Sequence, residues 1–248
     1  MDVTYRFLYF FLPPYNMCLG ESQRHKRKVS EMKKENKKKF ILAVGMLAAF
    51  VLWTIAVRLV DVQAIGPQGS SVGLAGINQL VHRLTGVNFS LYAITDWLGL
   101  VPFGVVMGFA LLGLVQWIQR KNLLKVDYSL FVLGGFYLVV IAAYLFFEKV
   151  VVNYRPVLIE GILEVSYPSS TTLLVMCVMP TARMQFNDRI KNERLRRWTV
   201  IVITAFIVFM VIGRLLAGVH WVTDIIGGAL LSTGLVMLYD AICSLQSQ

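Results

Sequence analysis

Charged residues are scarce in this chain. Only 15% of its 248 residues are Asp, Glu, Lys or Arg, whereas 57% are hydrophobic and the mean hydropathy is +0.66. Soluble domains are about one quarter charged. The composition therefore excludes an ordinary soluble domain and indicates a membrane protein.

Cysteine and acidic residues are also few. Cys18, Cys177 and Cys243 are far apart, so they form no disulfide framework and match no common metal-binding spacing. The 14 acidic residues are outnumbered by 24 Lys and Arg, which gives a net charge of +10. A charge of this sign is typical of nucleic-acid binding, but here the basic residues lie between apolar stretches and form no stripe. We expect no nucleic-acid partner.

Six apolar stretches predict an all-α membrane protein, a six-transmembrane helical bundle. A bilayer core of about 30 Å needs about 20 residues of helix. The predicted spans are Phe40–Val60, Leu98–Ile118, Tyr128–Phe147, Ser169–Ala182, Trp198–Leu216 and Trp221–Tyr239. The fourth is the shortest and begins with polar residues. We expect residues 1–39 to form a basic cytoplasmic segment and residues 40–248 to form one membrane domain.

The N-terminal residues do not have the order of a cleaved signal peptide. The apolar run at residues 5–12 is short, and the basic run follows it instead of preceding it. Met32, followed by more lysines, resembles an ordinary start of a membrane protein. We interpret residues 1–31 as an extension.

The distribution of basic residues predicts the orientation in the plasma membrane. Residues 1–39 and the loops after the second and fourth spans hold nineteen of the 24 Lys and Arg. Basic loops stay in the cytoplasm, so both termini are expected inside. The segment 62–96 then lies outside. Within it, Leu74, Ile77, Val81 and Leu84 recur at helical spacing, which predicts a short amphipathic helix on the membrane surface.

Three separate polar pieces fall on this outer side. They are Lys149 to Arg155-Pro156 after the third span, Pro168-Ser169-Ser170-Thr171 at the start of the fourth, and Arg214 to His220 and Asp224 between the last two. The alternation of spans alone brings them to one face, so the sequence predicts a shared, outward-facing site.

Each piece suits a phosphate group. Lys149, Arg155 and Arg214 supply three cations, and the arginine fork matches two phosphate oxygens at once. A helix that starts near Ser169 offers free N–H groups and hydroxyls to an anion. His220 and Asp224 are four residues apart and share a helix face, so the carboxylate can orient the ring for attack on phosphorus.

These pieces resemble the motifs of the type 2 phosphatidic acid phosphatase superfamily. The family pattern is Lys, six residues, Arg-Pro; then Pro-Ser-Gly-His; then Ser-Arg, five residues, His, three residues, Asp. The resemblance covers roughly residues 90–240. It implies a phosphatase without a metal or other cofactor, in which His220 forms a phosphohistidine and Asp224 orients it. Binding of the phosphoryl group would fall to Lys149, Arg155, Ser169, Ser170 and Arg214.

The chain departs from this pattern at three places. Lys149 is one residue too close to Arg155, Gly213 replaces a serine, and Thr171 stands at the position of the catalytic histidine that protonates the leaving group. Threonine is no acid at ordinary pH. His82, Glu160 and Glu164 are candidate substitutes.

The missing acid suggests a preference among substrates. An alkoxide leaving group has a conjugate acid of pKa roughly 16, whereas the phosphate that leaves a diphosphate has a pKa of about 6. We therefore predict a lipid phosphatase or diphosphatase that favours diphosphates, with undecaprenyl diphosphate as a candidate substrate. The alternative is a pseudoenzyme that only binds lipid phosphates. A transporter is disfavoured because the span centres carry no charge.

Overall fold

The computed structural model describes residues 15–245, and their side chains from residue 30 onward. Apart from three isolated β-bridges, the regular structure in this range is helical. The elements run, in chain order, as α2 (Tyr15–Leu59), η1 (Pro67–Gly69), α3 (Ala75–Thr85), α4 (Phe89–Leu98), α5 (Val101–Arg120), η2 (Leu123–Lys125), α6 (Tyr128–Lys149), α7 (Ser170–Arg189), α8 (Glu193–Leu216) and α9 (Val222–Leu245). The prediction of an all-α protein is confirmed for this range.

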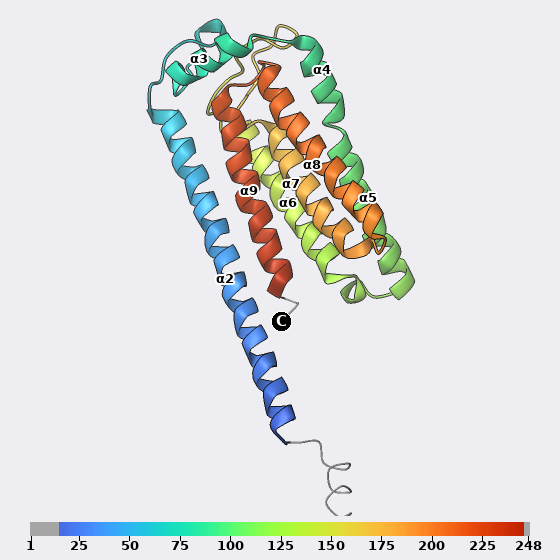
Figure 1. Ribbon diagram of the computed structural model, residues 1–248. Helices are drawn as coiled ribbons and strands as arrows, with labels where there is room; N and C mark the ends of the chain where they lie inside the picture. The colour runs from blue at the N-terminus through green and yellow to red at the C-terminus, as the bar shows by residue number, and fades with distance from the viewer. Residues whose placement is uncertain (1–14, 246–248) are drawn as a thin grey trace, which may run out of the picture.

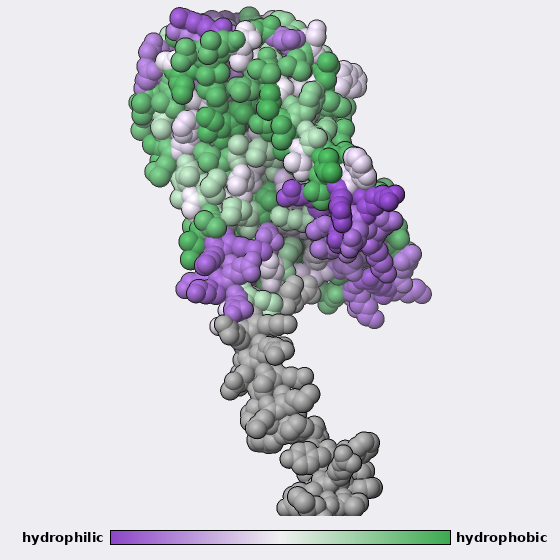
Figure 2. Space-filling view, in the orientation of Figure 1, coloured by the Kyte–Doolittle hydropathy of each residue, from purple (hydrophilic) through white to green (hydrophobic). Residues whose placement is uncertain are grey.

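Long helices packed side by side form the body of the molecule (Figure 1). Five stretches are long and apolar enough to cross a membrane: Ser30–Leu59, Phe89–Arg120, Tyr128–Lys149, Glu193–Leu216 and Val222–Leu245. Figure 2 shows a largely apolar surface along these helices, with polar groups gathered at their ends. Because a bilayer solvates apolar side chains, this distribution suits a multi-pass membrane protein.

The fourth predicted span corresponds to α7, which lies among the other helices (Figure 1). It begins with Ser170, Thr171 and Thr172, and it carries Arg183 and Arg189 near its other end. These polar residues leave no apolar stretch of sufficient length, so α7 is absent from the five candidate spans. The count of six spans therefore stays a prediction.

Several helices differ from the predicted spans in length. α2 continues without a break across residue 39, the expected boundary between the basic segment and the membrane domain. The predicted second span begins in the corner between α4 and α5, near Pro102. The first turn of a helix tolerates proline, because its N–H has no helical partner there.

The predicted amphipathic helix is present as α3. Its residues Ile77 and Leu84 are exposed, the latter by 79%, and α3 lies at the end of the bundle opposite the C-terminus (Figure 1). The beginnings of α7 and α9 and the end of α8 lie at that same end. The topology thus brings the three polar pieces together, as their common side predicted.

Candidate active site

His220 lies in the short connection between α8 and α9 and is only 3% exposed. Gly218 shapes this connection, since its φ of +67° favours glycine and an added Cβ would come within 1.8 Å of the Gly86 carbonyl oxygen. His82 supports the same connection: its Nε2 lies 3.1 Å from the Gly218 carbonyl oxygen, and its ring packs 5.4 Å from that of Trp221. His82 is thus engaged in holding the loop.

One ring nitrogen of His220 faces a cation. Nε2 lies 3.3 Å from Nη2 of Arg214, and a guanidinium group can only donate hydrogen bonds. Nε2 must therefore be the acceptor, so the proton of the neutral ring is on Nδ1. Burial, together with the charges of Arg155 and Arg214, holds the pKa of His220 well below its ordinary range. The ring is neutral at pH 7, with its lone pair on Nε2.

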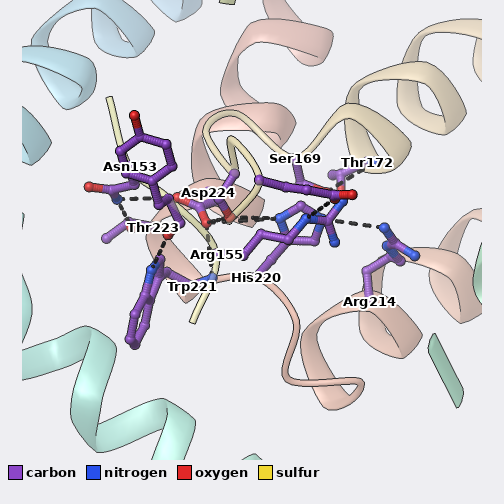
Figure 3. Close-up of polar contacts among 12 residues, drawn as sticks. Asn153, Arg155, Ser169, Thr172, Arg214, His220, Trp221, Thr223 and Asp224 are labelled. Carbon is purple, nitrogen blue, oxygen red and sulfur yellow. Dashed lines mark hydrogen bonds and ion pairs between the residues drawn. The ribbon is translucent and has the colours of Figure 1, made fainter. Parts of the chain in front are cut away.

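The other ring nitrogen reaches Asp224 through a serine. Nδ1 lies 3.0 Å from the Ser166 hydroxyl, which donates a 2.5 Å hydrogen bond to Oδ2 of Asp224. The direct distance from Nδ1 to Oδ2 is 3.9 Å. Asp224 also accepts hydrogen bonds from the backbone N–H of Trp221 at 2.9 Å and from the amide of Asn153 at 3.3 Å. Figure 3 shows His220 between Asp224 and Arg214. Sequence reasoning missed Ser166 and Asn153, which belong to no motif.

Arg155 and Arg214 are far apart in the sequence but lie beside the same aromatic ring. Their guanidinium carbons lie 5.9 and 5.1 Å from the ring centre of Tyr92 on α4, within the range of cation–π attraction. Arg214 also donates towards the hydroxyl of Thr95 at 3.4 Å and towards Asp96 at 3.5 Å. The sequence carried no sign that α4 supports the site.

Several donor atoms of the two arginines are buried without a hydrogen-bond partner. Nη1 of Arg155 and Nε of Arg214 are of this kind. Nε of Arg155 forms an ion pair at 2.9 Å with Glu164, outside hydrogen-bond geometry. A buried donor left unpaired costs free energy, so these N–H groups indicate an anion site beside His220. Glu164 is already engaged with Arg155.

Ser169 caps the beginning of α7. Its hydroxyl accepts from the N–H and the hydroxyl of Thr172, and its own N–H donates to the Asp224 carbonyl oxygen at 3.1 Å. Ser170 lines a recess that also contains His220. The positive end of α7 therefore lies beside the histidine, where it favours an anion.

Of the expected site residues, Ser170 and His220 line this recess, and the other six, Lys149, Arg155, Ser169, Thr171, Arg214 and Asp224, do not. The residues that line it are Tyr144, Phe147, Glu148, Val165, Ser166, Tyr167, Pro168, Ser170, Leu173 and His220. Lys149 is exposed at the end of α6, and Thr171 lies near Gly99, where an added Cβ would be 3.5 Å from its methyl group. The expected roles of both at the phosphoryl group stay predictions.

One comparison, with a protein-family model, agrees with the motifs. The model of the PAP2 superfamily matches residues 135–242, a range that holds all three polar pieces. No curated protein sequence is significantly similar to the chain. A similar solved structure is that of a transmembrane PAP2 type phosphatidylglycerolphosphate phosphatase from Bacillus subtilis. It is 19% identical, the alignment covers 81% of this chain and 95% of that one, and the TM-score is 0.49. The motifs and the matching model thus identify residues 135–242 as a PAP2 superfamily region.

Proposed function

We propose that the protein is a membrane phosphatase that hydrolyses a lipid-linked phosphate or diphosphate through a phosphohistidine on His220. The observation that carries the proposal is the placement of a neutral, buried imidazole beside two buried arginines with unpaired N–H groups. A nucleophile and an anion site thus share one small space.

The chemistry follows from this geometry. A phosphoryl group would accept hydrogen bonds from Arg155 and Arg214, and this would release the Nε2 lone pair from Nη2 of Arg214 for attack on phosphorus. The attack places positive charge on the ring, and the hydrogen bonds from Nδ1 through Ser166 to Asp224 stabilise it. Two guanidinium groups offset the charge of the phosphoryl oxygens in the transition state. The residues thus supply the charge stabilisation that a metal gives to other phosphatases.

A lipid substrate is supported by the position of the site. It lies at one end of a bundle of apolar helices, where a headgroup can enter while its tails stay in the bilayer. By the positive-inside rule this end is the outer one. Thr171 favours substrates whose leaving group needs little protonation, so we propose diphosphates such as undecaprenyl diphosphate as the preferred class. The same residue favours the second candidate, a pseudoenzyme that binds lipid phosphates without turnover.

Phosphate release from undecaprenyl diphosphate by the purified protein in detergent tests the proposal. Release that disappears in His220→Ala, together with a labelled phosphoryl group trapped on His220 in the wild type, is expected. Binding of the lipid with no release above the His220→Ala background would instead identify the pseudoenzyme.

A further inference from the structure

The recess beside His220 contains one carboxyl group, that of Glu148 on the last turn of α6. It lies on the same wall as Tyr144, one helical turn earlier, and the two side chains interact. Ser166, Pro168 and Ser170 line the recess from the segment around the beginning of α7. Glu148 and His220 thus border the same recess.

Glu148 also occupies an informative position in the sequence. It is seven residues before Arg155, the spacing at which the family pattern has its lysine. Lys149 is the next residue along α6, and successive residues on a helix point about 100° apart. Glu148 faces the recess, while Lys149 is not among its lining residues. The expected cation is thus replaced by an acid, and the phosphate-binding charge comes from Arg155 and Arg214.

The site otherwise lacks an evident donor of a proton to the leaving group. Thr171 has no acidic proton at neutral pH. Of the substitutes, His82 is engaged with the loop at Gly218, and Glu164 pairs with Arg155. Glu160 lines a different cavity, which it shares with Asp96 and Trp97.

We propose that Glu148 is the catalytic acid and base of the reaction, in place of the missing histidine. This inference rests on the proposed function. In the first step Nε2 of His220 forms a bond to phosphorus, the bond from phosphorus to the leaving oxygen breaks, and the carboxyl proton of Glu148 passes to that oxygen. In the second step the Glu148 carboxylate takes a proton from water, the resulting hydroxide oxygen attacks phosphorus, and the N–P bond breaks. Inorganic phosphate leaves, and both residues regain their starting forms.

In its protonated form Glu148 donates a hydrogen bond to the bridging oxygen. An acid here also allows the turnover of monoesters, whose alkoxides need a proton. Removal of the Glu148 carboxyl should therefore increase the preference for diphosphates over monoesters.

A pair of substrates that differ in their leaving group tests the inference. One is a lipid phosphate monoester with an alkoxide leaving group, and the other is p-nitrophenyl phosphate, whose phenolate leaves without a proton. A positioned acid contributes about 10²–10⁴-fold in rate. We expect Glu148→Gln to lower kcat for the lipid monoester by about 10²-fold or more, and kcat for the aryl phosphate by less than about tenfold. Glu148→His, which restores an acid, is expected to recover part of the lost rate.

Glu193→Gln is the matched control, because it makes the same change in the first turn of α8, at the end of that helix opposite Arg214. It is expected to turn over both substrates at the wild-type rate. An equal loss on both substrates in Glu148→Gln, or no loss, would overturn the role of Glu148 while His220-dependent turnover still supports the proposed function. A wild-type protein that releases phosphate from neither substrate would overturn both.

Discussion

The hydroxyl group of Ser166 lies between Nδ1 of His220 and Oδ2 of Asp224, which are 3.9 Å apart. The carboxylate therefore acts on the ring through a serine. The contribution of the serine to this contact can be tested by mutation.

Removal of the serine hydroxyl should slow the reaction without abolishing it. One hydrogen bond contributes about 1–1.5 kcal/mol, and a change of about 1.4 kcal/mol in the barrier is a factor of ten. We expect Ser166→Ala to lower kcat by about tenfold and to leave KM nearly unchanged. Ser244→Ala, at the opposite end of α9, is the control. Identical kcat values for Ser166→Ala and the wild type would contradict the arrangement.

Arg214 should control the affinity for phosphate-like anions. It is 1% exposed and has an unpaired Nε, so Arg214→Gln removes the charge and the Nε donor. Orthovanadate at about 100 times its Kd stabilises a protein by about 2.7 kcal/mol. We expect vanadate to raise the unfolding temperature of the wild type in detergent and to have little effect on Arg214→Gln. An equal rise in both proteins would place the anion elsewhere.

The protonation state of His220 predicts how stability depends on pH. Its pKa in the folded state is below the ordinary value of 6.5, so the unfolded chain binds this proton at a higher pH than the folded one. The corresponding stability is complete above pH 6.5 and is lost as the pH falls from there towards the folded pKa. We expect the unfolding temperature to fall more between pH 7.5 and pH 5 in the wild type than in His220→Gln. Equal falls would mean that the folded and unfolded pKa values of His220 are alike.

Gly227 permits the close approach of α9 to the segment before α7. A Cβ at this position would come within 2.6 Å of the Tyr167 ring, which is 1% exposed and bonded to Thr54 at 2.7 Å. Such overpacking costs about 1–3 kcal/mol. We expect Gly227→Ala to lower the unfolding temperature and, because Tyr167 adjoins Ser166, to lower activity as well. Gly108→Ala is the control, since an added Cβ meets nothing within 4 Å there. Equal unfolding temperatures in the two variants would disprove the close packing.

Chemical labelling can establish the orientation in the membrane. With Cys18, Cys177 and Cys243 replaced, single cysteines at Ser71, beside the site end, and at Lys191, in the basic loop, are both exposed. A membrane-impermeant thiol reagent applied to intact cells should label the first and spare the second. The reverse result would place the site on the cytoplasmic side.

The sequence by itself determined which long segments are helical and where one end of most spans lies. Long apolar runs such as Tyr128–Phe147 have no stable alternative to a helix in a bilayer, because each backbone polar group must be paired within the segment. It also determined that Arg155, Arg214, His220 and Asp224 would share one end, since the alternation of spans requires it. The spacing of the last three carried the resemblance to the family.

The tertiary structure decided which side chains reach one another. Ser166, Asn153 and Tyr92 lie in no motif. Ser166 and Asn153, in the connection after α6, meet His220 and Asp224, and Tyr92 on α4 meets the arginines, only because the chain folds these segments together. The choice between Glu148 and Lys149 depends on the rotation of α6 about its axis. The number of residues between α6 and Arg155 does not determine that rotation, because the loop between them can accommodate a shift of one residue. Packing of α6 against α7 and α9 sets it, and packing places the acid, and not the lysine, in the recess.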